Sequence, residues 1–325
     1  MDYNPRPIKS DLKSYRINPE PEKPSRWSFL KILREYSTLK EFYPEINPYA
    51  EAYKFRDNMY AIFTEGLMRN CGDMWNYLII GPEKALLIDT GFGVGNLKAL
   101  CEKLSGGKEI ICANTHMHLD HIGGNLWFDK VYCHEYDKKY IERSMYPEFI
   151  TEKTLDSNGK PIDTYYDPND LPPFHKYEVI GVKDGYIFDL GDGYEVKLVH
   201  LSGHTPGQSG FWDKQNKCFF IGDTTSAIPA AEDEEHPDCC TVKSLRDKVA
   251  NVLNTFGDEI GGVFPGHGTI DVHPVTLQYL VDACNAVLKN PQNYDKFTNF
   301  GGRKMMSKFI FQQGSDLKYT EDSVE

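Results

Sequence analysis

Four side chains that can bind metal ions lie within six residues of one another, in the run Thr115-His116-Met117-His118-Leu119-Asp120-His121. The run follows the apolar stretch 110–113, so a strand that ends in a turn could direct all four side chains to one point. Imidazole and carboxylate groups suit divalent zinc, iron or manganese. Four ligands in so short a loop are more than one structural ion can use. The run therefore favours a pair of metal ions, and paired ions usually serve hydrolysis.

Three later positions repeat this arrangement of a polar ligand in a loop after a strand. They are His204 in Ser202-Gly203-His204-Thr205, Asp223 in Ile221-Gly222-Asp223-Thr224, and His267 in Pro265-Gly266-His267-Gly268. A glycine beside each one allows a tight turn and a close approach of the backbone to an ion. A single histidine in a loop would indicate an ordinary capping or solvated residue, but chance explains the whole set poorly.

With these residues the chain resembles the metallo-β-lactamase fold superfamily over about residues 53–290. The motif HxHxDH of that family matches at His116, His118, Asp120 and His121, and its later ligands match at His204, Asp223 and His267. The resemblance implies an α/β fold, a four-layer αββα sandwich with the metals at the shared edge of two sheets. It also implies that one metal binds His116, His118 and His204, that the other binds Asp120, His121 and His267, and that Asp223 bridges both.

Two divalent metal ions per chain are therefore the expected cofactors, with zinc first and iron or manganese as alternatives. Two cations that share a water lower its pKa from about 16 towards neutrality, so a metal-bridging hydroxide could attack a carbonyl or phosphoryl centre. Asp120 is the expected catalytic residue, because it can orient the nucleophile and pass a proton to the leaving group. Asp89 ends the run 86–88 and is expected to support a ligand from behind, although a turn-capping role explains it equally well.

The ligand set also separates branches of the superfamily. The best-known β-lactamases have cysteine at the position of Asp223, which argues against that reading. Glyoxalase II-like thioesterases and quorum-signal lactonases fit better, but many of the former have histidine where Gln208 stands, and the latter often have tyrosine where Ser226 stands. We therefore expect a dinuclear-metal hydrolase of a small-molecule ester, thioester or lactone.

Two other enzyme functions stay open on the same fold. The first is an oxidoreductase similar to mononuclear-iron persulfide dioxygenases, which would use only His116, His204 and Asp223. The second is a phosphodiesterase-type hydrolase.

Composition limits the choice of partner. The chain has 325 residues and a formal net charge of -12, which argues against nucleic acid or an anionic membrane as a partner. Its first residues lack the apolar core of a signal peptide, no run is long enough to span a bilayer, and the eight cysteines form no CxxC pair. We expect a cytoplasmic protein with a small-molecule substrate, and leave homo-oligomer formation open.

The elements that must position the ligands follow from apolar patterning and turn residues. Strands are predicted at 77–80, 85–88, 110–113, 185–188, 194–199, 218–221 and 263–264, and helices at 97–104, 242–256 and 275–289. Residues 1–52 are expected to form an N-terminal extension with a packing helix or a lid, 53–290 the catalytic domain, 134–185 an inserted substrate or lid segment, and 291–325 a C-terminal tail. Within the insertion, Tyr165 and Tyr166 are predicted to bind substrate.

Overall fold

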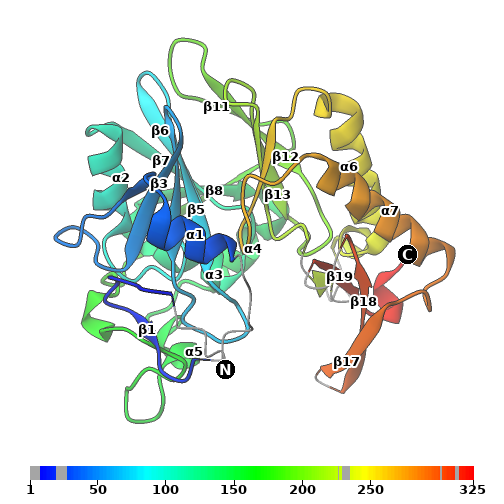
Figure 1. Ribbon diagram of the computed structural model, residues 1–325, viewed down its shortest axis with the longest axis horizontal. Helices are drawn as coiled ribbons and strands as arrows, with labels where there is room; N and C mark the ends of the chain where they lie inside the picture. Colours follow the sequence, from blue (N-terminus) through cyan, green and yellow to red (C-terminus); the bar gives the residue numbers. More distant parts are fainter. Residues whose placement is uncertain (1–7, 20–27, 226, 229–234, 301, 312–314) are drawn as a thin grey trace, which may run out of the picture.

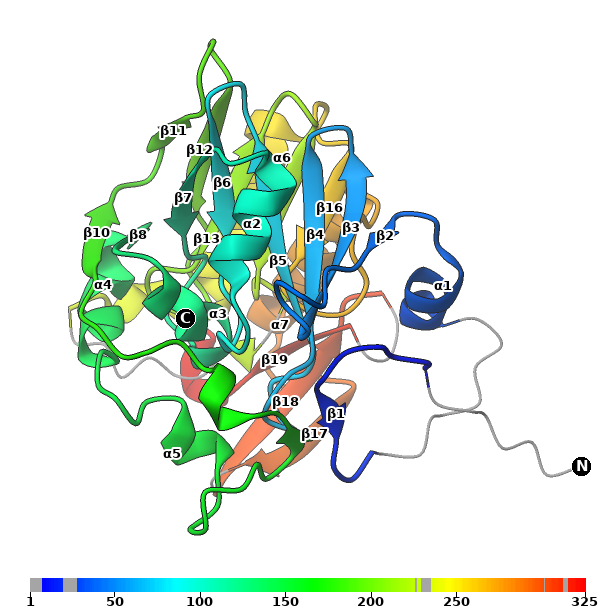
Figure 2. The ribbon, with the colours of Figure 1, turned by 90° about the vertical axis from the view of Figure 1, so that its left-hand side faces the viewer.

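In the computed structural model of the protein, two β-sheets pack face to face and helices cover their outer faces (Figures 1 and 2). The structure describes residues 8–19, 28–225, 227–228, 235–300, 302–311 and 315–325. Ser226 lies outside these ranges. The predicted α/β sandwich is confirmed.

The first sheet has eight strands, in the order β10-β8-β7-β6-β5-β4-β3-β2. They are β10 (Glu178–Val182), β8 (Lys130–His134), β7 (Glu109–Ala113), β6 (Lys84–Ile88), β5 (Met74–Ile80), β4 (Met59–Thr64), β3 (Ala50–Arg56) and β2 (Lys40–Glu41). The second sheet has the order β11-β12-β13-β14-β16. Its strands are β11 (Ile187–Asp189), β12 (Glu195–His200), β13 (Ser209–Asp213), β14 (Cys218–Gly222) and β16 (Gly262–Pro265).

Strand β6 shows why the layers form. Successive side chains of a strand point to opposite faces, and this strand is apolar on both. Leu86 and Ile88 lie in the core between the two sheets, whereas Ala85 and Leu87 lie in the core beneath the helices. Helices α2 (Leu97–Ser105) and α4 (Glu135–Arg143) contribute to that outer core, and α6 (Val242–Phe256) and α7 (Val275–Lys289) cover the second sheet.

Several segments outside the expected core are folded into the domain. The predicted boundary at residue 53 falls inside β3, and the inserted segment 134–185 supplies β10, an edge strand of the first sheet. The region expected to be a tail, 291–325, contains three strands that join β15 (Ala227–Ile228) in a small sheet beside α7 (Figure 1). These strands are β17 (Lys296–Phe300), β18 (Arg303–Phe309) and β19 (Asp316–Tyr319). The tail prediction missed them because short strands of mixed polarity carry a weak periodic signal.

The remaining elements are short and lie mainly around one edge of the sandwich. They are β1 (Tyr15–Arg16), α1 (Phe29–Tyr36), α3 (Leu119–Ile122), η1 (Gly123–Trp127), α5 (Thr151–Thr154), β9 (Thr164–Tyr165), η2 (Pro168–Asp170), η3 (Pro237–Cys239) and η4 (Glu321–Ser323). Among the described residues, no helix is long and apolar enough to cross a membrane.

Helix α1 packs on the domain through a buried ion pair. Leu33 lies in the core between the sheets, and Arg34 donates from Nε to Glu51 Oε2 at 2.8 Å. Both charged side chains are nearly inaccessible, at 5% and 1% exposure, and the guanidinium lies over the ring of Phe63. Moving α1 away would leave Glu51 as an uncompensated buried charge, at a high cost in free energy. The ion pair therefore holds the helix in place.

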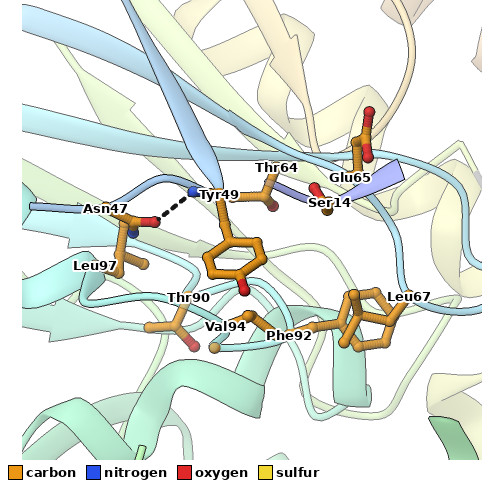
Figure 3. Close-up of a pocket in the computed structure, with 11 residues that line it drawn as sticks. Ser14, Asn47, Tyr49, Thr64, Glu65, Leu67, Thr90, Phe92, Val94 and Leu97 are labelled. Atoms are coloured by element: carbon orange, nitrogen blue, oxygen red, sulfur yellow. Dashed lines mark hydrogen bonds between the residues drawn. The ribbon is translucent and has the colours of Figure 1, made fainter. Parts of the chain in front are cut away.

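A small cavity lies between the N-terminal segment, the end of β4 and the loop before α2 (Figure 3). Three polar atoms on its walls, Asn47 Nδ2, Thr64 Oγ1 and Glu65 Oε2, have no hydrogen-bond partner in the part of the chain that the structure describes. Burial, opposed by the Arg34 guanidinium and aided by the Asp73 carboxylate, raises the pKa of Glu65 to about 7. Ionising this carboxyl group therefore costs free energy in the folded state.

Replacing Glu65 tests this cost. In the unfolded state the Glu65 carboxyl group loses its proton near pH 4.5, whereas in the folded state it keeps the proton up to a pH of about 7. Its contribution to the free energy of unfolding is therefore complete below pH 4.5 and is lost as the pH rises through about 7. The loss is on the order of 3 kcal/mol. We expect wild type to lose stability relative to Glu65→Gln between pH 5 and pH 8, as measured by urea unfolding. A constant difference across that range would contradict the assignment.

Candidate metal centre

The structure brings all seven predicted ligands together at one edge of the sandwich. Each follows the carboxyl end of a strand: His116, His118, Asp120 and His121 come after β7, His204 after β12, Asp223 after β14 and His267 after β16. Their nitrogen and oxygen atoms form three overlapping groups, each with its atoms within 4.8 Å of one another. Chain segments far apart in sequence thus converge on one small volume.

The first group consists of three imidazoles. His118 Nδ1 lies 3.0 Å from His116 Nε2 and 2.9 Å from His204 Nε2. Burial and the neighbouring imidazoles lower the pKa of His118 to about 3 and hold that of His116 well below its usual value. Neutral imidazole is the form that binds metal. Tetrahedral zinc with Zn–N bonds of 2.0–2.1 Å separates its ligand nitrogens by about 3.3 Å, so this spacing suits a shared cation.

The second group combines imidazoles with a carboxylate. Asp120 Oδ2 lies 3.4 Å from His267 Nε2 and 4.0 Å from His121 Nε2. His121 Nε2 is buried, yet it makes no hydrogen bond to any described residue. Burial alone would lower the pKa of His121, but the carboxylates of Asp89, Asp223 and Asp120 raise it to about 10. An unbonded buried nitrogen among carboxylates is the arrangement expected of a metal ligand.

Asp223 lies between the three-histidine group and the group that contains Asp120. Its Oδ1 is 3.4 Å from both His121 Nε2 and His267 Nε2, and its Oδ2 is 3.8 Å from His204 Nε2. Despite burial, His267 and His121 hold the pKa of this carboxyl group well below its usual value. One carboxylate therefore presents an oxygen to each group, which is the geometry that a bridging ligand requires.

Gly266 leaves space for this arrangement. A Cβ there would lie 2.8 Å from a ring carbon of His121 and 2.9 Å from Asp223 Oδ1. Neither neighbour can move without leaving the centre, so a side chain at this position would displace a ligand.

Asp89 supports a histidine in each group. Its Oδ2 accepts from His121 Nδ1 at 2.8 Å, which leaves His121 Nε2 facing Asp120 and Asp223. The same carboxylate accepts from Thr115 N at 2.7 Å and from Thr115 Oγ1 at 2.8 Å. Since the hydroxyl has given away its only hydrogen, it accepts from His116 Nδ1 at 3.0 Å. Asp89 holds a left-handed φ of 61°, an unusual backbone conformation for a residue other than glycine.

Sequence reasoning missed Asp137, which connects two of the ligand loops. This residue is completely buried in α4, directly after β8. It accepts from Met117 N at 3.1 Å in the first loop and from Thr205 Oγ1 at 2.8 Å and Gly207 N at 2.7 Å in the loop of His204. Its position after a strand was the available signal, but the residue fell inside the segment assigned as an insertion.

Cys71 was also missed. Its thiol lies at the edge of the centre: burial raises its pKa to about 12, and the nearby carboxylates of Asp120 and Asp223 add to the rise. It belongs to the loop between β4 and β5, which also supplies the carbonyl of Asp73 that accepts from His267 Nδ1 at 2.9 Å. No local pattern in the sequence links this loop to His267.

The two predicted substrate residues differ in exposure, and their role stays a prediction. Tyr166 is a core residue with no exposed surface, and its hydroxyl is bonded to Thr154 Oγ1. Tyr165 is 36% exposed and stacks on Tyr15, with ring centroids 4.8 Å apart. Gln208 is buried and donates to the carbonyls of Ser209 and Ile221, so it supports the loop structure.

Two named relatives are similar to this chain over about half of its length. Over 171 residues the chain is 27% identical to the acyl-coenzyme A thioesterase MBLAC2 of Homo sapiens. The match covers 47% of this chain and 58% of the relative. The chain thus matches just under three-fifths of that protein's length. It is also 27% identical over 168 residues to the hydroxyacylglutathione hydrolase GloC of Haemophilus influenzae, covering 51% of this chain and 71% of the relative.

Solved structures share the fold. The DIM-1 metallo-beta-lactamase superposes with a TM-score of 0.50 at 19% identity, covering 73% of this chain and 97% of that one. A metallo-beta-lactamase from Pontibacter korlensis gives a TM-score of 0.52 at 17% identity, with 72% and 97% covered. The family model of the metallo-beta-lactamase superfamily matches residues 71–290, well over half of the chain and all seven candidate ligands. The protein therefore belongs to the metallo-beta-lactamase superfamily.

Proposed function

We propose that the protein is a dinuclear-metal hydrolase that cleaves a small-molecule ester, thioester or lactone. The observation that carries this proposal is the Asp223 carboxylate, which directs one oxygen to His204 and the other to His121 and His267. A carboxylate can act as a bridging ligand only where two cations bind side by side, so the position of Asp223 favours a dinuclear site.

The residues fit two divalent ions, for which zinc is our first choice. One site would use His116, His118 and His204, and the other Asp120, His121 and His267, with Asp223 shared. Bound there, the ions would supply an acidified water as nucleophile and Lewis acidity for the substrate carbonyl.

Asp120 is the proposed acid–base residue. Its carboxyl group is largely buried, yet His121 and His267 lower its pKa, so it stays ionised near neutral pH. An ionised carboxylate can orient a water molecule, accept its proton and later deliver that proton to the leaving group. The Nε2 atoms of His267 and His121 lie 3.4 Å and 4.0 Å from its Oδ2.

Thioesters are the substrates to test first. Both curated relatives have names that denote hydrolysis of an acyl group, from coenzyme A in one case and from glutathione in the other. The persulfide dioxygenase alternative would use only three of the seven converging ligands and would leave the other four, His118, Asp120, His121 and His267, without a role. A dinuclear hydrolase uses them all.

The first prediction from this proposed function concerns enzymatic activity and metal content together. Purified protein should hold about two metal ions per chain and hydrolyse at least one member of a panel of small acyl thioesters, activated esters and lactones. Asp120→Asn should lower kcat on that substrate by about 100-fold or more, because acid–base assistance alone contributes that much. Elemental analysis and initial rates measure the two quantities.

Asp258→Asn, at an exposed position after α6, is the matched control and should keep wild-type rates. A fully loaded protein that hydrolyses no substrate of the panel would overturn the proposal. One iron per chain with oxygen uptake on glutathione persulfide would establish the oxidoreductase instead. Turnover of a phosphodiester alone would move the function to that class.

A second prediction concerns Asp137. Asparagine at this position would place an amide NH₂ against donors that now meet carboxylate oxygens, so the loops of His116 and His204 would separate. We expect Asp137→Asn to weaken the site of His116, His118 and His204 for Zn²⁺ by about 10- to 100-fold, as is usual when an outer partner of a metal ligand is lost. Titration of apo-protein against a chromophoric chelator measures this.

Asp213→Asn provides the matched control. Asp213 is also completely buried and accepts from Tyr194 Oη and Asn216 Nδ2, but these partners lie just before β12 and in the β13–β14 turn. Its substitution should lower the free energy of unfolding and leave both zinc affinities unchanged. Equal zinc losses in the two variants would show that the effect of Asp137 is general destabilisation.

A further inference from the structure

The N-terminal segment reaches the metal centre through a two-stranded ribbon. Strand β1 pairs antiparallel with β9, with Tyr15 opposite Tyr165 and Arg16 opposite Thr164. Because side chains alternate along a strand, the two faces of the ribbon differ. The stacked tyrosines form one face, and Arg16 and Thr164 form the other.

The Arg16 face clamps the loop between β4 and β5. Arg16 donates to Thr164 Oγ1 at 2.9 Å and to Asp73 Oδ1 at 2.9 Å. Thr164 Oγ1 in turn donates to the Gly66 carbonyl at 2.7 Å, and Gly66 N donates to Asp73 Oδ1 at 3.1 Å. The guanidinium therefore fixes Asp73, with Gly66 held between the same partners.

Asp73 in turn fixes His267. The main-chain carbonyl of Asp73 accepts from His267 Nδ1 at 2.9 Å, and the next residue, Met74, forms a β-bridge with His267. Because Nδ1 donates to this carbonyl, Nε2 is the nitrogen that His267 can offer to a metal ion, and it lies 3.4 Å from both Asp120 Oδ2 and Asp223 Oδ1. Any displacement of the Asp73 carbonyl would turn the imidazole away from these carboxylates.

The clamp contributes little to stability by itself. Arg16 and Asp73 are each 29% exposed, and an ion pair that is this exposed to solvent adds little to the free energy of unfolding. Its effect is on position: a planar guanidinium that binds two acceptors at once sets the direction of the loop more narrowly than a point charge could.

We propose that Arg16 is a positioning residue for the second metal site and acts through Asp73 on His267. Arg16 lies in the N-terminal segment, outside residues 71–290 that match the family, so this chain completes its metal centre with a residue of its own extension. The inference depends on the dinuclear site of the proposed function and is independent of which bond the enzyme cleaves.

The test is a two-site Zn²⁺ titration of apo-protein against a chromophoric chelator. Arg16→Gln should weaken one site by about 10- to 100-fold and leave the other unchanged, because the three-histidine site is held by separate contacts. Arg16→Lys should recover only part of the lost affinity, since lysine keeps the charge but cannot bind both acceptors in one plane. Asp73→Asn, which preserves shape, should weaken the same site.

Arg56→Gln is the matched control. Arg56 donates to Asp271 Oδ1 at the same 2.9 Å and to Asp271 Oδ2 at 3.1 Å, with side chains 29% and 30% exposed, and it also donates to the Phe55 carbonyl. It should leave both zinc affinities unchanged, and thermal unfolding of every apo-variant verifies folding. Two wild-type affinities in Arg16→Gln, or equal losses at both sites, would overturn the proposal. Two zinc ions bound without any hydrolysis would overturn the proposed function and leave this inference standing.

Discussion

The metal centre depends on atoms that repel one another in the absence of a cation. His118 Nδ1 lies 3.0 Å from His116 Nε2 and 2.9 Å from His204 Nε2, and each of these nitrogens turns a lone pair towards the shared space once the other ring nitrogen holds the proton. The Asp120 and Asp223 carboxylates are buried beside them. Such a cluster persists only if the surrounding structure holds each ligand from behind and a cation, or protons, occupies the space between them.

Three aspartates do most of this holding. Asp89 binds His121 directly and His116 through Thr115, so it supports one ligand of each site. Asp137 joins the loops of His116 and His204, and Asp73 directs His267 through its carbonyl. Each lies close to the end of a strand, where polar backbone groups are free to be satisfied by a side chain. Hence the two sheets supply the rigid frame, and these three aspartates transmit that rigidity to the ligands.

The ligands were predictable because their signal is local. A dense run of His and Asp after an apolar strand, followed by single ligands beside glycine, specifies a strand-end metal site from residue type and spacing alone. The sandwich followed from resemblance and from apolar runs such as that of β6. What supports the site was not predictable, because Asp137, Asp73 and Arg16 act through contacts between segments distant in sequence, and nothing near them marks the partner. Tyr165 and Tyr166 show the same limit: they are adjacent, and only the pairing of β9 decides that one is exposed and the other buried.

The two groups of ligands also differ in charge, and this bears on their chemistry. In the three-histidine group, burial and the neighbouring imidazoles hold His116 and His118 in their uncharged form. The other group contains Asp120, and Asp223 lies between the two. If two divalent cations bind as proposed, their four positive charges would face the two negative charges of these ligands, and the loaded centre would keep a positive charge in a buried setting. Such a centre would stabilise the negative charge that develops on the carbonyl oxygen during attack, and also the charge on a departing alkoxide or thiolate. Before metal binds, the negative carboxylates raise the pKa of His121 and His267, so protons are drawn to the nitrogens that a second cation would occupy. Metal and proton therefore compete at this second site far more than at the first, and the support of His267 by Asp73 and Arg16 lies where that competition is closest.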